Sequence, residues 1–210
     1  MVIDLTLPLA DGMPLFPGFK SFESEPSVSD ETGSLTHRIH LSTHQGTHID
    51  APRHFIEDGA TLDEISLDRL RGEATVVDLR SHRGDPITAD VLASTDADIG
   101  AGDITLLLTG DVDEHFYDDD FFDKAATLTP NAAEWLMERG VSVVANDFLT
   151  EGIDAQDRPV HKTLCGAGVP IVEYLCNVDA IADRESVDFT CVPIRLDGFE
   201  ASPVRAFVIE

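Results

Sequence analysis

Apolar and polar residues follow one another along this chain in the rhythms that strands and helices produce. The segments "VIDLTLPL" (2–9) and "HRIHLST" (37–43) alternate residue by residue, which predicts strands with one buried face. Four longer apolar runs predict mostly buried strands: "ATVVDL" (74–79), "ITLLLTG" (104–110), "VSVVANDF" (141–148) and "VPIVEYL" (169–175). The tail predicts two more strands, in "VDFTCVPIRLDG" (187–198) and "SPVRAFVIE" (202–210), joined by a turn.

Helices are expected between several of these strands. In "TPNAAEWLMERG" (129–140), Thr129 can cap, Pro130 suits the first helical position, and Gly140 ends the helix. "VHKTLCGAG" (160–168) predicts a shorter helix that glycines terminate. No linker, repeat or low-complexity segment divides the 210 residues. We therefore expect one domain over 1–210, of the α/β class with a mixed sheet.

Charge narrows the range of partners. The chain has 40 acidic and 14 basic residues, a formal net charge of −26, and only three lysines. Such a surface repels nucleic acid and anionic membranes, which are therefore unlikely partners on electrostatic grounds. The acidic residues are spread along the chain rather than gathered in one tail, as on the surfaces of proteins from salt-accumulating halophiles.

Localisation and redox state can also be predicted. The start of the chain lacks the pattern of a signal peptide, and no segment has 18 uninterrupted apolar residues, so we expect a soluble, cytoplasmic protein. Cys165, Cys176 and Cys191 are odd in number and widely spaced. They indicate neither a disulfide framework nor a cysteine-rich zinc module, and we expect them to be small buried hydrophobes.

Histidine is concentrated in one short stretch of the chain. Five of the eight histidines lie within 18 residues, at His37, His40, His44, His48 and His54. If 37–43 is a strand, His44 stands near its end, and the chain then turns because Gly46 permits unusual backbone angles and Pro52 prevents a regular helix. His48 and Asp50 lie two residues apart, on one side of an extended segment. His44, His48 and Asp50 could therefore surround one ion and leave coordination positions open, as in catalytic zinc sites.

Other hydrolytic motifs are missing from the sequence. It has no GxSxG nucleophile elbow, no GxxxxGK[ST] phosphate loop and no HExxH zinc helix. The order HxxxHxD also differs from the HxHxDH order of the metallo-β-lactamase group. The histidine segment is thus the strongest candidate for chemistry.

"HQGTHIDAPRHF" (44–55) resembles the HxGTHxDxPxHF signature of the cyclase family that contains bacterial kynurenine formamidase. "DLTLPLADGMPLFPG", "LLLTG" and "VHKTLCGAGVPIVEYL" resemble other family segments in the same order, so the resemblance covers nearly the whole chain. It implies the swivelling β/β/α architecture with a mixed sheet, metal-dependent hydrolysis of a small-molecule amide, and a homodimer or larger homo-oligomer. The serine that the family has shortly after its aspartate is not evident in "NDFLTEGID".

The resemblance also assigns roles to residues. It implies that His44, His48 and Asp50 bind a first divalent metal, that Asp50 bridges to a second metal held by His161 and Glu173, and that His54 is the general acid/base. From the residues alone, His161 precedes a predicted helix, and Glu173 interrupts an apolar strand. A buried carboxylate is costly unless it is paired or metal-bound, whereas an edge-strand glutamate could simply face water.

The remaining candidates have weaker signals. His37 and His40 match nothing in the motif and either support the site or lie on the surface, whereas His82 and His115 are expected to be solvated. Asp147 stands where the family usually has an aspartate and could provide a supporting hydrogen bond. Phe16, Phe55 and Phe148 are candidates for an aromatic substrate wall, with core packing as the alternative for each.

Three functions fit the sequence. The first is an arylformamidase that hydrolyses N-formylkynurenine to kynurenine and formate with metal-activated water, while His54 passes a proton to the leaving nitrogen. The second is a cyclic amide hydrolase of the isatin hydrolase type, although such relatives tend to carry an amide where this chain has Glu173. The third is a metal-binding protein without catalysis. Histidine and carboxylate ligands suit zinc first, with manganese as an alternative.

Overall fold

The computed structural model describes all 210 residues, most of which surround one large sheet. The strands are β1 (Val2–Asp4), β2 (Glu23–Val28), β3 (Leu35–His40), β4 (His48–Asp50), β5 (Arg71–Asp78), β6 (Pro86–Ile87), β7 (Ile104–Leu108), β8 (Thr127–Leu128), β9 (Val143–Asn146), β10 (Ile171–Glu173), β11 (Ser186–Pro193) and β12 (Ala201–Ile209). The helices are α1 (Ala89–Ser94), α2 (Asp111–His115), α3 (Phe121–Lys124), α4 (Pro130–Arg139) and α5 (Pro159–Gly166).

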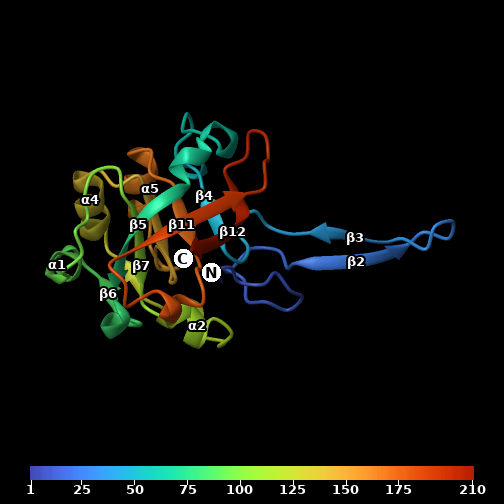
Figure 1. Cartoon of the computed structure of the whole chain (residues 1–210), viewed down its shortest axis with the longest axis horizontal. Helices are drawn as coiled ribbons and strands as arrows, with labels where there is room; N and C mark the ends of the chain where they lie inside the picture. Colours follow the sequence, from blue (N-terminus) through green and yellow to red (C-terminus); the bar gives the residue numbers. More distant parts are fainter.

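The large sheet has eight strands and closes on itself (Figure 1). Its order is β1-β12-β11-β5-β7-β9-β10-β4, and a further antiparallel pairing joins β12 to β4. Strands β5, β7, β9 and β10 run parallel to one another, while β4, β11 and β12 pair antiparallel with their neighbours. The predicted α/β class with a mixed sheet is confirmed.

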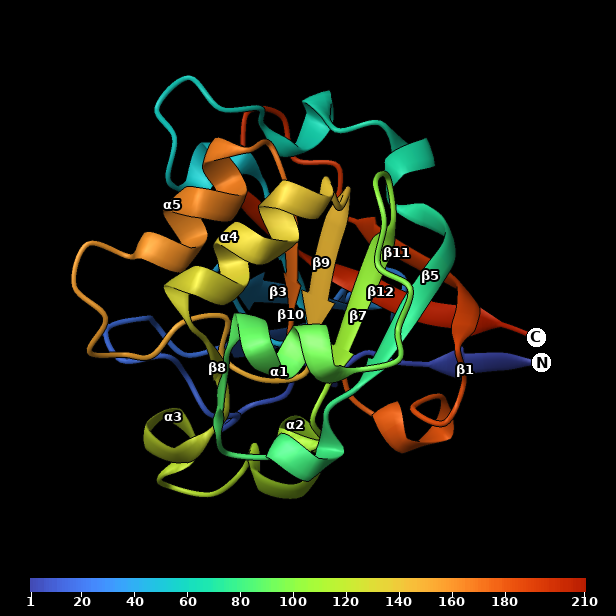
Figure 2. The same cartoon turned by 90° about the vertical axis from the view of Figure 1, so that its left-hand side faces the viewer.

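Two apolar cores lie on the two faces of this sheet. Ile49 of β4 and Val172 of β10 belong to the core inside the closed sheet. Val144 and Ile171 belong to the second core, on the outer face, together with apolar residues of α1, α4 and α5. Figure 2 shows these helices covering that face. Because successive strand residues face opposite sides, the neighbours of Ile49 and Val172 in their strands face the helix layer.

The sequence predictions succeed in the centre and at the end of the chain. The predicted helix at 129–140 is α4, and Gly140 ends it with a φ of 72°, in the left-handed region that favours glycine. Thr129 precedes the helix, but its hydroxyl donates a hydrogen bond to the Ile87 carbonyl oxygen at 3.0 Å instead of capping. The segment 2–9 is strand only over Val2–Asp4, because regular pairing with β12 ends there and only an isolated bridge, from Thr6 to Leu175, follows.

Strands β2 and β3 form a hairpin that projects from the rest of the molecule (Figure 1), and we call residues 23–40 the hairpin arm. The expectation of a strand with one buried face at 37–43 is wrong, since β3 ends at His40 and all of its residues are exposed. No other element of the chain covers the arm. Its apolar side chains Val28, Leu35 and Ile39 are therefore exposed to 61%, 62% and 52%.

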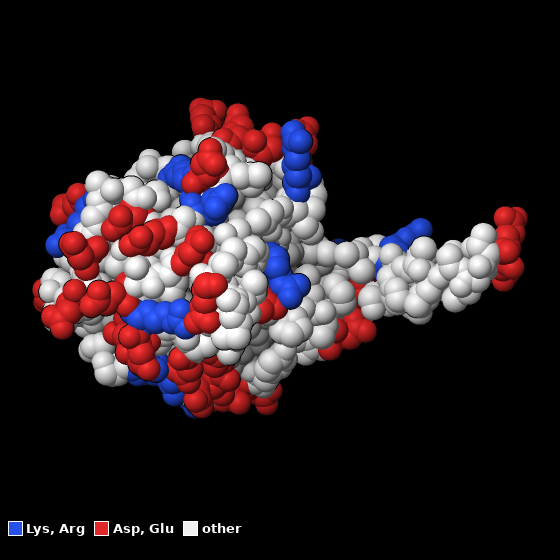
Figure 3. Space-filling view, viewed as in Figure 1, with Lys and Arg blue, Asp and Glu red and all other residues white.

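Acidic side chains are scattered over the globular face seen in Figure 3, and a further group lies at the tip of the arm. They do not form a single acidic tail, in agreement with their spread along the sequence. None of the helices has the length and apolar composition that crossing a membrane requires. All three cysteines are free, and two of them, Cys165 and Cys191, are buried as predicted, whereas Cys176 is half-buried.

Candidate metal centre and active site

The pairing of β4 with β10 places three acidic and imidazole side chains on one face. His48 lies opposite Glu173 in the antiparallel register, and Asp50 lies opposite Ile171. Ile49 and Val172 point into the closed sheet, so His48, Asp50 and Glu173 point to the helix side. Glu173 is only 8% exposed, in a strand paired on both sides. The alternative of a water-facing edge glutamate is thereby excluded.

His44 comes from the turn before β4, not from the end of a strand as expected. The Ser42 hydroxyl accepts a hydrogen bond from the His44 main-chain N–H at 3.4 Å, and the Gln45 side chain accepts one from the Ser42 N–H at 3.3 Å. Such local bonds offer the backbone an alternative to strand pairing. Gly46 completes the turn with a φ of 62°, and a Cβ there would lie 2.8 Å from the Leu9 side chain. The predicted role of Gly46 in the turn is confirmed.

His161 is the third residue of α5, so it lies inside the helix predicted over 160–168 and does not precede it. Its Nδ1 lies 2.8 Å from Glu151 Oε2, and the Val160 main-chain N–H donates a hydrogen bond to Glu151 Oε1 at 2.9 Å. Glu151 thus holds both the helix N-terminus and the imidazole, and His161 Nε2 is directed to Asp50 and Glu173. Glu151 was not predicted from the sequence, where its only signal is an acidic residue in the loop between a buried strand and this helix.

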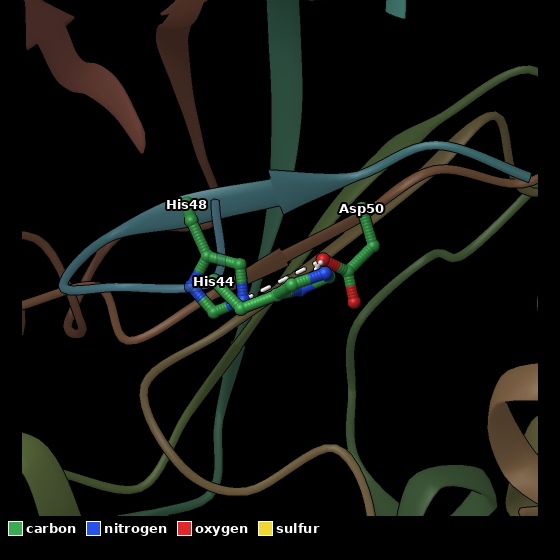
Figure 4. Close-up of side chains that lie close together, drawn as sticks. All are labelled: His44, His48 and Asp50. Atoms are coloured by element: carbon green, nitrogen blue, oxygen red, sulfur yellow. Dashed lines mark ion pairs between the residues drawn. The ribbon is translucent and has the colours of Figure 1, made fainter. Parts of the chain in front are cut away.

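The side chains converge on Asp50. His44 Nδ1 lies 2.8 Å and His48 Nε2 lies 3.5 Å from Asp50 Oδ1, and Figure 4 shows both rings directed to that carboxylate. On the other side, His161 Nε2 lies 3.9 Å from Asp50 Oδ2 and 4.0 Å from Glu173 Oε1. The donor atoms of His44, His48 and Asp50 all lie within 4.8 Å of one another, as do those of Asp50, His161 and Glu173. Asp50 is common to both groups.

Unpartnered polar atoms at the centre of the cluster fit a cation. His48 Nε2 and both carboxylate oxygens of Asp50 are buried and lack a well-aligned hydrogen bond, although His44 Nδ1 lies 2.8 Å from Asp50 Oδ1 and Glu173 Oε2 lies 3.3 Å from His48 Nε2. The His48 ring is fixed from behind, because its Nδ1 lies 2.8 Å from the Gly46 carbonyl oxygen. Buried polar atoms without partners cost about 1–3 kcal/mol each, more when charged, so this arrangement calls for a ligand. Imidazole and carboxylate donors are those that zinc and manganese bind.

Electrostatics keep the carboxylates ionised. Burial alone would raise the pKa of Asp50, but the nearby His44 and His48 lower it well below its usual range. Burial likewise opposes ionisation of Glu173, and the His48 ring overcomes it and lowers the pKa of Glu173. Conversely, burial lowers the pKa of His44, while Asp50 raises it, with a net increase. The centre therefore presents negative oxygens to any bound cation.

His54 lies beside the cluster but in neither ligand group. It follows β4 in a short 3-10 turn, Pro52–His54, which Pro52 opens. Its Nε2 lies 4.0 Å from Asp50 Oδ2, and its ring centroid is 4.1 Å from that of His44. Burial, aided by the charges of His44 and His161, lowers the pKa of His54 to about 4. Its imidazole is thus neutral at pH 7 and can accept a proton.

A cavity of about 220 Å³ opens onto this cluster. Phe16 and Phe55 line it as expected, but Phe148 does not, because it is fully buried in the outer core. Two further aromatic side chains, Phe19 and Tyr174, line the cavity and were not predicted. Phe19 has no periodic signal in its loop, and Tyr174 directly follows β10 in a mostly apolar run, where it looks like a core residue.

The other candidates lie apart from the centre. His37 and His40 are exposed on the hairpin arm, so they are surface residues and do not support the site. His115 is exposed beside Asp118, and His82 is half-buried. Asp147 is fully buried and accepts hydrogen bonds from the main-chain N–H groups of Thr109 and Gly110, at 2.7 and 2.5 Å. It therefore provides the predicted supporting hydrogen bonds, between the ends of β7 and β9.

Comparisons with known proteins agree with this architecture. The family model described as "Putative cyclase" matches residues 3–153. A kynurenine formamidase of Erythrobacter litoralis is 29% identical, over 99% of this chain and 93% of that protein. A solved structure described as a potential metal-dependent hydrolase with cyclase activity is 32% identical, with a TM-score of 0.81 over 99% of this chain and 96% of that one. Isatin hydrolase A from Labrenzia aggregata is 25% identical, with a TM-score of 0.86 over 99% and 93%.

The closed mixed sheet and the His/Asp/Glu cluster on its outer face define an α/β protein of the metal-dependent hydrolase class. More specifically, the chain belongs to the cyclase family, because the family model matches well over half of it. The resemblance found in the HxGTHxDxPxHF motif is confirmed, and so is the cyclase-like fold that it implies.

Proposed function

We propose that the protein hydrolyses the carbon–nitrogen bond of a small aromatic amide, with N-formylkynurenine as the first choice of substrate. The observation that carries this proposal is Asp50, whose buried carboxylate has no well-aligned hydrogen bond and belongs to two adjoining groups of ligand atoms. The relative from Erythrobacter litoralis is named a kynurenine formamidase, which supports the choice of substrate.

We assign two cations to the centre. His44, His48 and Asp50 would hold the first, and Asp50, His161 and Glu173 the second, because each set of donor atoms lies within 4.8 Å. Zinc suits these ligands best, and manganese is the alternative. Cations bound there lower the pKa of water toward neutrality and polarise a carbonyl oxygen.

His54 is assigned the proton transfer. Its neutral imidazole, half-buried beside Asp50, accepts a proton from the attacking water and then delivers it to the leaving nitrogen. It contributes to neither ligand group, so the protein does not need it for metal binding. This separates a catalytic centre from a metal-binding protein without catalysis, which would have no use for His54.

The cavity supports an aromatic substrate. Phe16, Phe19 and Phe55 give it apolar walls next to the ligand cluster. A cyclic amide such as isatin is the second candidate, favoured by the high structural similarity to isatin hydrolase A. The buried Glu173 carboxylate favours the formamidase, because it completes the second group of ligand atoms.

The hairpin arm supports the proposal of a homodimer or larger homo-oligomer. Its exposed Val28, Leu35 and Ile39 are apolar side chains that no element of the same chain covers. A second copy of the chain would remove them from water. Adaptation to high salt and a cytoplasmic location stay predictions from the sequence.

The test measures metal content and turnover together. The protein is assayed at high salt with N-formylkynurenine and with isatin, as purified, after chelation, and after zinc or manganese is restored. We expect two metal ions per chain and formamide hydrolysis that disappears with chelation and returns with metal. Bound metal without turnover of either compound would contradict the proposal.

A variant of His54 tests the division of labour. His54→Ala should keep its metal and lose turnover by about a hundredfold to ten-thousandfold, the range typical of a general acid/base. His40→Ala, on the exposed arm, is the matched control and should retain both. Full activity of His54→Ala across the pH range would show that the proton transfer is assigned to the wrong residue.

A further inference from the structure

Arg158 is the one lysine or arginine that lines the cavity at the candidate centre. The other charged liners, apart from histidines, are the carboxylates Asp50, Glu151 and Glu173. The chain as a whole has 14 basic residues against 40 acidic ones. A guanidinium at this place is therefore unusual for the molecule, and none of the roles assigned so far uses it.

The structure holds this side chain in a fixed position. Asp157 and Arg158 have φ values of 62° and 50°, in the left-handed region that non-glycine residues rarely adopt, directly before α5. The Arg158 Nη1 donates a hydrogen bond to the Gly152 carbonyl oxygen at 2.9 Å, and Nη2 donates to the Ile153 carbonyl oxygen at 3.3 Å. The guanidinium carbon lies 5.4 Å from the centre of the Phe16 ring. Backbone and ring together restrict where the cation can lie.

The guanidinium still has binding capacity. Two of its five N–H groups donate to the two carbonyl oxygens, which leaves three without a partner. It forms none of the ion pairs of this chain, so no carboxylate neutralises it. A preorganised guanidinium recognises a carboxylate more specifically than a lysine does, because its planar N–H groups match the two oxygens.

We propose that Arg158 binds a carboxylate that the amide substrate carries away from its scissile bond. This inference rests on the proposed function and narrows its substrate class to aromatic amides that carry a carboxylate. The carboxylates that line the cavity repel the carboxylate of such a substrate, and Arg158 supplies a local positive charge that offsets this repulsion. Neutral cyclic amides have no group for it.

The experiment compares two compounds that differ only in this charge, N-formylkynurenine and its α-carboxamide. Metal-loaded wild type, Arg158→Met and Arg158→Lys are assayed with both at one salt concentration. We expect Arg158→Met to raise KM for N-formylkynurenine about tenfold to a hundredfold, the effect of losing a hydrogen bond to a charged group. KM for the carboxamide should stay within about twofold, and Arg158→Lys should restore part of the difference.

Arg53→Met is the matched control. Arg53 is an exposed arginine in the turn beside His54 and does not line the cavity. Its loss should therefore change KM only slightly, and equally for both compounds. Equal losses for the two compounds in Arg158→Met would overturn the inference and leave Arg158 as a structural tie of the loop before α5. If the wild type hydrolysed neither compound, the proposed function would fail, and this inference with it.

Discussion

The hairpin arm and the segment that follows it contain histidines in similar numbers, yet only one of the two regions forms a centre. His37 and His40 lie on the arm, exposed on a strand that nothing covers. Only a few residues later, His44 and His48 lie against Asp50, and His48 Nε2 is buried without a hydrogen-bond partner. Residue type and spacing are similar in both regions, while burial and surroundings differ.

The difference shows what turns a histidine-rich stretch into a candidate metal centre. β4 is paired with β10 and lies under α5, so Glu173 and His161, more than a hundred residues away in sequence, complete the ligand set. The arm has neither neighbour. Its histidines remain in water, where unpaired imidazoles cost nothing. Long-range packing, more than local composition, therefore defines the site.

The largest effect is expected from Asp50→Asn, which removes the buried carboxylate on which the histidines of the site converge and so makes them more like those of the arm. The amide removes the charge that both groups of ligand atoms share, so metal content should fall below one ion per chain. Turnover should fall about a thousandfold or more, because metal catalysis contributes several kcal/mol and each 1.4 kcal/mol is tenfold. Metal analysis and kinetics on the same preparation measure both.

The matched control for this prediction is Glu25→Gln, which removes a carboxylate from the exposed arm. It should change neither metal content nor turnover. Circular dichroism of both variants checks that the fold is retained. If Asp50→Asn kept two ions per chain, the comparison between arm and centre would break down, since a shared carboxylate would not be what binds them.

The sequence predicts the local half of the site better than the distant half. Gly46, the alternation of His48 and Asp50, and the ends of α4 are short-range features, so they can be predicted from neighbouring residues. The same reasoning gave a wrong prediction for the hairpin arm, because the alternation of apolar and polar residues does not show whether another element packs on the strand. Phe148 was misplaced for a related reason, since an aromatic near a motif can face either side of the sheet.

The residues that contact the metal-ligand histidines could not be predicted from local sequence patterns. Glu151 meets His161 across ten residues of loop and helix, and Glu200, whose Oε1 lies 3.5 Å from His44 Nε2, comes from the turn before β12. Nothing in the residues around Glu200 marks it. Such contacts depend on how the sheet closes, which periodicity does not determine. They became visible only with the three-dimensional structure.

A smaller effect is expected when a ligand loses its support but stays in place. Glu151→Gln retains an amide oxygen that can accept the hydrogen bond from His161 Nδ1, while Glu151→Ala loses the acceptor completely. We expect zinc affinity to fall about tenfold to a hundredfold in Glu151→Ala, the usual effect of removing the group that orients a ligating histidine, and less in Glu151→Gln. Competition with a chromophoric chelator measures the affinity without any assay of turnover.

Glu57→Gln controls for the general loss of negative charge near the site, because Glu57 is exposed in the loop after His54. Its zinc affinity should match that of the wild type. Equal affinities for Glu151→Ala and wild type would mean that α5 alone orients His161, and the contrast between supported and unsupported histidines would lose its basis.

The smallest effect is expected at Asp147, where burial shifts the pKa of a carboxyl group that is not a metal ligand. Burial raises the pKa of Asp147 from 3.8 to about 7, with the nearby Asp111 adding to the shift. Between these two values the folded chain holds a proton that the unfolded chain has lost, so this carboxyl stabilises the fold at low pH, and its contribution disappears as pH rises to 7. The slope is at most about 1.4 kcal/mol per pH unit, the value for one proton.

Urea unfolding of the metal-free proteins measures this effect. The free energy of unfolding of the wild type should decrease relative to that of Asp147→Asn between pH 5 and 7, and the difference should be constant above pH 7. Glu25→Gln, exposed on the arm, should show no such trend, and a parallel pH dependence in wild type and Asp147→Asn would assign the buried proton elsewhere.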